Sequence, residues 1–222
     1  MDERELLIPT KLVRCKRKSL SLQIKNNGDF IVRAPIKMPD KNIFDFITQK
    51  SGWIIKKRTT QLSSEFAPLT FNRSERINIF GVSHQIVLMD KKNIFCQDGI
   101  IFVPNVEPKN NLVKYLKKLA KAYITNRVAE LAALYNFEYL GISISSAKSC
   151  WGSCSYNNKL HFTYKLIMCP KAVIDYIILH ELCHTKVKNH SEKFWDLVRA
   201  CDYDYKTKER WIKENKAIIE VI

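Results

Sequence analysis

Several features are scarce in this sequence of 222 residues, and each shortage excludes a class of protein. No apolar run approaches the roughly 20 residues that cross a bilayer, and the opening MDERELLIPTK lacks a basic region followed by an apolar stretch. We therefore expect a protein that is neither exported nor inserted in a membrane. The seven cysteines are spread from Cys15 to Cys201, without the dense spacing of a small disulfide-stapled domain. This pattern fits a reducing, cytoplasmic location.

Acidic residues are also scarce, at 22 against 37 lysines and arginines, which gives a formal net charge of +15. Clustered basic side chains attract nucleic acid, anionic surfaces and acidic substrates, although a basic surface can also serve solubility alone. Contact with nucleic acid through the basic surface therefore stays open. The apolar content of 46% is sufficient for a buried core, in one large domain or two small ones.

Short runs typical of β-strands dominate residues 11–104. The clearest are SLSLQI, DFIVRAP, RINIF, HQIVLM and GIIFVP, with turn signals at Asn27-Gly28 and Asp98-Gly99. One helical insert interrupts them, with Asp40 as its expected cap, and a second helical piece restarts at Trp53. We expect both helical pieces to pack against the sheet.

The segment PNVEPKNN, residues 104–111, is the best candidate for a domain boundary because it has two prolines and no periodicity. We expect a β-rich region with a helical insert over residues 1–104 and a second domain over residues 105–222. Apolar residues at helical spacing predict one long amphipathic helix from Leu112 to Tyr135.

The remainder of the second domain is expected to be mostly helical with a short sheet. Two strands are predicted around GISISS and KLHFTYKLI, with CWGSCSYNN as the loop between them. Pro170 then opens the helix AVIDYIILHELCHTKVK, Ser191 caps the helix EKFWDLVRAC, and KTKERWIKENKAI forms a last helix. The predicted fold class is α+β.

Histidine is rare, yet three of the five histidines fall within the eleven residues HELCHTKVKNH. His180 and His184 are four apart on the predicted helix, so both imidazoles can turn toward a single metal ion. Glu181 lies next to them and can reach a metal-bound water as a general base. The helix is expected to end near Lys188-Asn189, so that His190 swings back as a third ligand.

Three protein ligands leave the fourth zinc position open for water, which describes a catalytic zinc, one per chain. Imidazole ligands also favour zinc over magnesium or calcium. A lone histidine is usually a surface or core polar group, whereas this spacing favours the metal site. The spacing also matches a metzincin, but Val187 replaces the glycine of that pattern and no methionine follows His190, which disfavours it.

Beyond the HExxH motif, the chain resembles the YgjP-like family of predicted zinc metallopeptidases, which are zincin-like and distantly similar to SprT-like proteases. The resemblance rests on WGSCS, a Pro-x-x-VIDY helix start, HELxH and NHSxxFW, and the N-terminal KRKSLSLQI, SGWIIKKR and FGVSHQIVL extend it over nearly the whole chain. It implies a minimal zincin-like metallopeptidase domain in which His180, His184 and His190 bind zinc and Glu181 is catalytic.

The expected function is a zinc-dependent metallopeptidase that hydrolyses peptide bonds by a metal-activated water, with Glu181 as general base. The alternative is a nucleic-acid-associated zinc protein or a protease that acts on DNA-bound proteins. The substrate-binding residues are not assigned; one hypothesis adds an extended peptide or protein substrate along an edge formed by residues 161–164. Tyr164, Tyr176 and a backbone amide are all open as the group that stabilises the oxyanion.

The cysteines near these motifs are not expected to bind metal. Cys150 and Cys154 have three residues between them and lack a second cysteine or histidine pair nearby, so Cys154 is expected to pack under its loop. Cys183 should point to a different face of the helix from His184, as a buried thiol. Trp151 and Trp195 are expected to wall the site.

Overall fold

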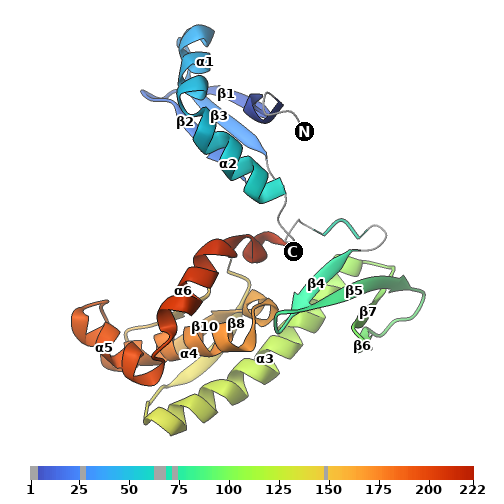
Figure 1. Ribbon diagram of the computed structural model, residues 1–222. Helices are drawn as coiled ribbons and strands as arrows, with labels where there is room; N and C mark the ends of the chain where they lie inside the picture. Colours follow the sequence, from blue (N-terminus) through green and yellow to red (C-terminus); the bar gives the residue numbers. More distant parts are fainter. Residues whose placement is uncertain (1–4, 26–28, 63–68, 72–74, 148–149) are drawn as a thin grey trace. The chain divides into compact units, whose positions relative to one another are not determined.

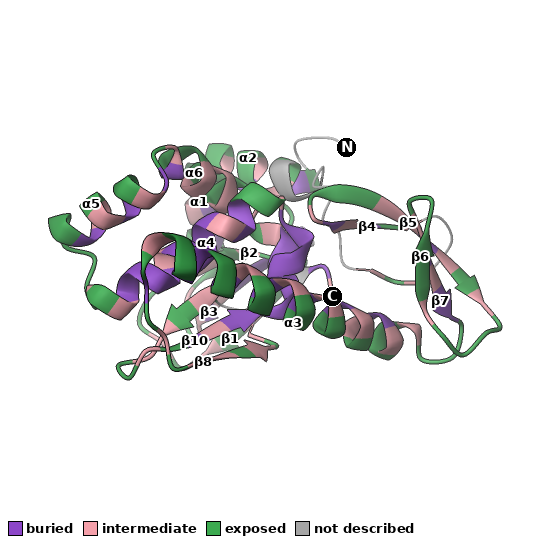
Figure 2. Ribbon diagram, turned by 90° about the horizontal axis from the view of Figure 1, so that it is seen from below, coloured by how far each residue is buried: buried purple, intermediate pink, exposed green. Residues whose placement is uncertain are grey.

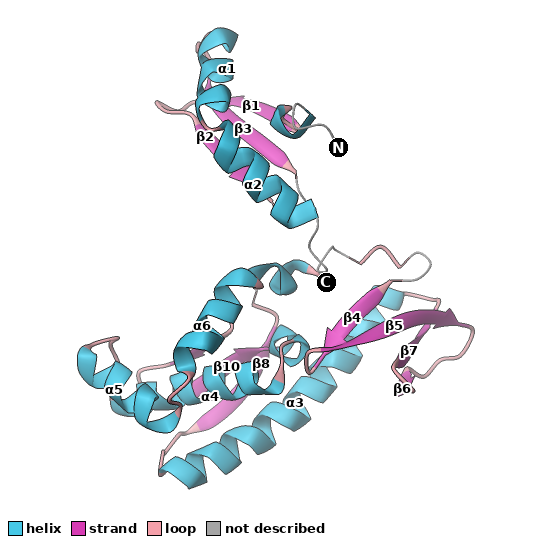
Figure 3. Cartoon of the chain, in the orientation of Figure 1, coloured by secondary structure: helices cyan, strands magenta, loops and turns pink. Residues whose placement is uncertain are grey.

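The computed structural model describes residues 5–25, 29–62, 69–71, 75–147 and 150–222 (Figure 1). It confirms an α+β fold, with short sheets and helices along the chain (Figure 3). The internal contacts divide the chain into two compact units, residues 1–68 and 69–220. None of the helices within the described residues has both the length and the apolar character needed to cross a bilayer.

The first unit is a three-stranded sheet covered by two helices. Its elements are η1 (Glu5–Leu7), β1 (Lys11–Cys15), β2 (Ser21–Ile24), β3 (Phe30–Pro35), α1 (Asp40–Gln49) and α2 (Ser51–Leu62). The central strand β3 pairs in parallel with β1 and antiparallel with β2. Both predicted helical pieces bury aliphatic side chains against β3, as expected; the core consists of Phe30, Val32, Ala34, Ile43, Ile47 and Ile54.

Two details of this unit differ from expectation, and a third falls outside the described residues. Asp40 is the first helical residue of α1 rather than its cap, because Pro39 precedes it with extended backbone angles. Strand β1 was not predicted, since KLVRC lacks strict alternation and is mostly exposed. The expected turn at Asn27-Gly28 lies outside the fully described residues.

The second unit begins with a four-stranded sheet in the order β4-β5-β7-β6. Its strands are β4 (Arg76–Ile79), β5 (Val82–Met89), β6 (Phe95–Gln97) and β7 (Ile100–Pro104). The turn signal at Asp98-Gly99 is confirmed: both residues have positive φ, 50° and 75°, and join β6 to β7 as a hairpin. Strand β6 itself was not predicted.

The β4–β5 turn attaches this sheet to the helical part of the unit. The Phe80 backbone N–H donates a hydrogen bond to the Ile167 carbonyl at 2.8 Å. Gly81 has φ +76°, and a Cβ there would lie 2.9 Å from Cα of Pro170, so both the turn and the close approach require glycine.

The division into units therefore differs from the expected domain boundary at 104/105. Strand β7 contacts α3 (Pro108–Tyr135), and β4 contacts η2 (Tyr164–Met168), so the sheet belongs to the same unit as the helices that follow it. The proline-rich segment 104–111 is a tight connection inside this unit. Local composition indicates an interruption of secondary structure, but it does not indicate which elements pack together.

Helix α3 (Pro108–Tyr135) is the longest helix among the described residues of the second unit. At 28 residues it is roughly 42 Å long, and it starts one turn before the expected Leu112. One stripe is buried along its length: Leu112, Leu116, Ala120, Ile124, Val128, Leu131 and Ala132. Asn136, with φ 53°, ends the helix in the left-handed conformation.

A second three-stranded sheet follows, in the order β8-β10-β9. Strand β10 (Lys159–Thr163) pairs in parallel with β8 (Gly141–Ser145) and antiparallel with β9 (Gly152–Cys154). The predicted loop CWGSCSYNN thus contains an unexpected strand. The expected peptide-binding edge at residues 161–164 is wrong, because β10 has a partner on each side and Tyr164 already belongs to η2 (Tyr164–Met168).

The chain continues with four helical segments, α4 (Lys171–Lys186), α5 (Glu192–Cys201), α6 (Tyr205–Glu214) and η3 (Lys216–Glu220). Pro170 precedes α4 and Ser191 precedes α5, as predicted. Helix α4 is largely buried (Figure 2) and contacts α3, β9, α5 and α6. It ends at Lys186 rather than near Lys188-Asn189: Val187 is already extended, and Asn189 is not left-handed.

Candidate metal centre

Three imidazoles from two neighbouring segments converge on one point. The Nε2 atom of His190 lies 3.1 Å from Nε2 of His180 and 3.2 Å from Nε2 of His184. Within the described residues, His180, His184 and His190 form a group whose candidate ligand atoms all lie within 4.8 Å of one another. A tetrahedral ion with Zn–N bonds of 2.0–2.1 Å requires nitrogens about 3.3 Å apart. The three side chains fit such an ion.

The local backbone explains this convergence. His180 and His184 are one helical turn apart on α4, so they share a face. Helix α4 ends at Lys186, and the extended Val187 reverses the chain so that His190 returns beside them before α5 begins. His184 Nδ1 lies 3.0 Å from the Val187 carbonyl. A proton donated to that carbonyl leaves Nε2 with the lone pair that a metal needs.

Aromatic side chains pack around the three imidazoles. Phe194, which is fully buried on α5, has its ring centroid 4.9, 4.3 and 4.8 Å from those of His180, His184 and His190. Trp195 lies 5.9 Å from His180 and 5.7 Å from His190 and stacks on Tyr205 at 5.5 Å. These rings restrict the rotation of the three imidazoles.

Glu181 lies on α4 beneath strand β9, 6% exposed. A Cβ at Gly152 would lie 2.8 Å from Cγ and 2.9 Å from Oε1 of Glu181. The carboxylate therefore occupies the space that a side chain at this strand position would take. No described residue donates a hydrogen bond to it.

Burial controls the charge of this centre. Desolvation raises the pKa of Glu181 to about 8. Desolvation, followed by repulsion from the other two imidazoles, lowers the pKa of His180 to about 3, and desolvation also lowers the pKa of His184. Both imidazoles are therefore neutral at pH 7, the state in which a ring nitrogen can bind a metal. Nδ1 of His180 is buried without a hydrogen-bond partner among the described residues.

A lysine ties the loop that carries His190 to the small sheet. Lys188 Nζ donates to the Ser155 carbonyl at 3.0 Å, and it also contacts the Asn158 side chain and, at 3.7 Å, Sγ of Cys154. These acceptors lie at or just after the end of β9. The loop between α4 and α5 is thereby held against the strand that lies over Glu181.

Of the other residues singled out in the sequence, some lie at the metal centre and some lie away from it. Tyr176 is buried with its ring 6.0 Å from His180, whereas Tyr164 is buried in η2 beneath Lys117 of α3. Cys183 is fully buried, as expected, and Cys154 is half-buried; within the described residues neither joins the metal-ligand group. Trp195 walls the site as predicted.

Sequence reasoning missed three contributors to the site. Phe194 was quoted only as part of a motif; it lies in the first turn of α5, and because His190 precedes that helix, helical spacing does not signal their contact. Val187 contributes only its backbone carbonyl, so the identity of its side chain gives no signal in the sequence. The need for Gly152 comes from a contact between distant segments, for which the sequence carries no local signal.

Comparison with known proteins identified a protein family. The sequence pattern of the YgjP-like metallopeptidase domain matches residues 18–215. No curated protein and no solved structure matched. The family match spans both compact units and includes every residue of the candidate metal centre.

Proposed function

This chain belongs to the YgjP-like metallopeptidase family, and we propose that it is a zinc-dependent peptidase that cleaves peptide or protein substrates in the cytoplasm. The observation that carries the proposal is the convergence of three Nε2 atoms, with His190 3.1 and 3.2 Å from the other two. One zinc ion per chain would be held by His180, His184 and His190. Three ligands leave a coordination position open to water.

When bound, the zinc ion supplies a Lewis acid that makes water acidic near pH 7 and polarises a scissile carbonyl. The chain provides the proton transfer. Glu181 is buried beside the histidine pair, and burial raises its pKa to about 8 in the metal-free protein. The positive charge of a bound zinc ion would lower that pKa, so that the carboxylate would take a proton from water and then release it to the leaving amine. The rings of Phe194 and Trp195 pack against the imidazoles of His184 and His190 and restrict their rotation.

We place the substrate along β9 instead of β10. Strand β9 is an edge of its sheet and contacts the metal-binding helix α4. An extended peptide that pairs with β9 would gain main-chain hydrogen bonds. It would also lie near Glu181, because Gly152 of β9 packs directly against that side chain. Tyr176, near His180, is the better placed of the two tyrosines considered for the oxyanion.

The first test is cleavage of a diverse peptide pool by zinc-loaded protein, detected by mass spectrometry. Glu181→Gln should lose roughly 100-fold or more of the rate while retaining zinc. Glu192→Gln is the matched control, the same change on an exposed residue at the start of α5. Equal cleavage by the wild type and Glu181→Gln would reject Glu181 as the base.

Metal content tests the ligand set independently of activity. His190→Ala should reduce bound zinc to well below one ion per chain, measured by elemental mass spectrometry after dialysis. His161→Ala provides the control, because that imidazole contacts Ser143 on β8. If His190→Ala kept full zinc, the proposed ligand set would be wrong.

A further inference from the structure

The first part of α3 is strongly basic. Between Pro108 and the first acidic residue, Glu130, the helix carries one arginine and five lysines: Lys109, Lys114, Lys117, Lys118 and Lys121. All five lysines are exposed, and among the described residues none forms an ion pair. Uncompensated positive charge on one helix concentrates anions at its surface.

A cavity of about 580 Å³ lies between this part of α3 and the segment joining β5 to β6. Three lysines line it, Lys92 from that segment and Lys114 and Lys118 from α3. The half-buried ring of Tyr115 and the side chain of Ile94 line the same cavity. Positive charge and an aromatic ring thus share one depression.

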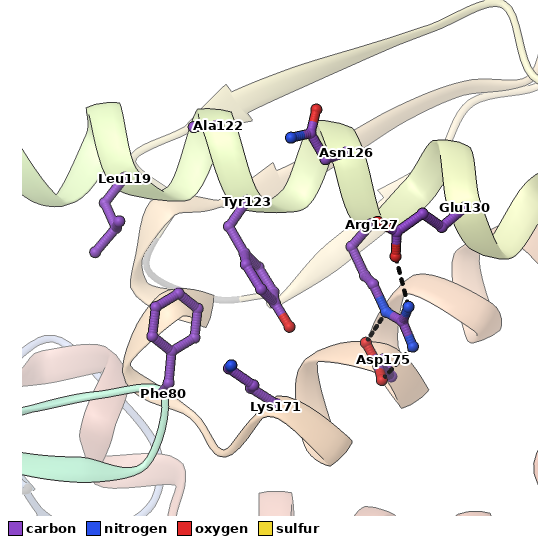
Figure 4. A pocket seen from close by; sticks show the side chains of 9 residues that line it. All are labelled: Phe80, Leu119, Ala122, Tyr123, Asn126, Arg127, Glu130, Lys171 and Asp175. Carbon is purple, nitrogen blue, oxygen red and sulfur yellow. Dashed lines mark hydrogen bonds and ion pairs between the residues drawn. The ribbon is translucent and has the colours of Figure 1, made fainter.

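A second cavity of about 580 Å³ continues along the helix (Figure 4). Leu119 and Ala122 line both cavities, so the two are neighbours. The second contains Phe80 and Tyr123, whose ring centroids are 4.6 Å apart. Lys171 Nζ lies 5.2 Å from the centroid of the Phe80 ring.

The two acidic residues of the second cavity share one arginine. Arg127 Nε and the Asp175 carboxylate are 2.8 Å apart, and the Arg127 guanidinium also contacts Glu130 at 2.6 Å (Figure 4). Lys171 forms no ion pair among the described residues. The arginine and Lys171 together balance the two carboxylates, so the two cavities, here called the α3 groove, keep the positive charge of the three lysines in the first cavity.

We propose that the α3 groove binds single-stranded nucleic acid. Phosphates would lie on Lys92, Lys114 and Lys118, and unpaired bases would enter the cavities against the rings of Tyr115 and Tyr123. This combination of a basic track with aromatic platforms is how proteins bind single strands without reading sequence. From Asn111 to Arg127 the groove extends over roughly 24 Å of helix, enough for several nucleotides.

The aromatic rings favour single-stranded nucleic acid over duplex nucleic acid and over an acidic peptide. In a duplex the bases are stacked on one another and cannot enter the cavities. An acidic peptide would satisfy the lysines but would bring no planar bases for the half-buried rings. The proposal does not depend on the metal centre, because no ligand histidine lines either cavity.

The test is fluorescence anisotropy of a labelled 20-nucleotide single strand, titrated with the full chain at 50 and 200 mM salt. With three or four phosphates contacted, affinity should fall roughly 20- to 50-fold between the two salt concentrations. Lys114→Ala with Lys118→Ala should weaken binding about tenfold or more and flatten that dependence. Tyr115→Leu should weaken it about fivefold or more with the salt dependence unchanged, because it removes stacking alone.

The matched control is Lys206→Ala with Arg210→Ala, which removes the same charge from α6. This variant should bind within about twofold of the wild type. Equal weakening by both double variants would overturn the proposal, as would equal affinity for a duplex of the same sequence. Equally effective competition by polyglutamate would assign the groove to acidic peptides instead.

Two further measurements separate nucleic-acid binding from zinc binding and locate the bound strand. Binding should be the same in EDTA and with zinc, so failure of the peptidase proposal would leave this one standing. Ultraviolet crosslinking to the wild-type chain, followed by mass spectrometry, should label peptides from α3 and the β5–β6 segment. Crosslinks confined to other elements would overturn the assignment even if a lysine variant failed to fold.

Discussion

Replacement of Gly152 by alanine tests how Glu181 is held. The added methyl carbon would lie 2.8 Å from Cγ and 2.9 Å from Oε1 of Glu181, whereas carbon atoms in ordinary contact are about 3.5–4.0 Å apart. The carboxylate must therefore move by roughly 1 Å. A displacement of that size at a catalytic group lowers the rate about 100-fold.

The change should separate catalysis from metal binding. We expect kcat for a peptide substrate to fall about 100-fold, with zinc affinity in a chelator competition within about threefold of wild type, because the three atoms nearest to the added Cβ all belong to Glu181 and not to a ligand histidine. The free energy of unfolding in urea should fall by about 1–3 kcal/mol through overpacking. Gly141→Ala is the matched control, since a Cβ there meets nothing within 4 Å.

A double variant identifies the clash as the cause. Glu181→Ala removes Cγ and the carboxylate, so adding Gly152→Ala in that background should cause little further loss of stability. Wild-type turnover by Gly152→Ala would refute the reasoning. An undiminished stability loss in the Glu181→Ala background would refute it equally, because the cost would then come from the backbone of β9.

Three other perturbations have definite expectations. Lys188→Met releases the loop that carries His190 and should weaken zinc binding about tenfold in a chelator competition, with Lys193→Met, an exposed lysine of α5, as control. Arg127→Lys loses the two-pronged bond to the carboxylate on α4 and should lower the free energy of unfolding by about 1–2 kcal/mol in urea, more than Arg199→Lys at an exposed pair. Burial raises the pKa of Glu181 to about 8, so below that pH the folded, metal-free protein holds a proton that the unfolded chain has released. Unfolding free energy in EDTA should therefore fall by up to about 1.4 kcal/mol per pH unit between pH 6.5 and 8, and Glu181→Gln should abolish this slope.

The local features of the histidine motif could be predicted from sequence because they depend on helical geometry. His180 and His184 share a helix face through their spacing alone, and the predicted bounds of α5 match the structure. The proline before α4 was also a sufficient signal. Such features involve residues within one or two turns of each other.

Features that depend on distant pairing could not be predicted in this way. Strand β9 has only three residues, and β10 pairs with it and with β8 through contacts that no local pattern specifies. The division into units at Pro68 and Leu69 likewise follows from packing of β4 and β7 on later helices.

The three histidines of the metal centre also lie within eleven residues of sequence, and this has a consequence for the denatured chain. Closing so short a loop has a small entropic cost, so the unfolded protein still presents three imidazoles close together. A ligand that binds both states raises the melting temperature less than its affinity for the folded state would indicate. Thermal shifts with zinc should therefore underestimate the affinity of the folded site, and the metal can associate with the nascent segment before the sheets have formed.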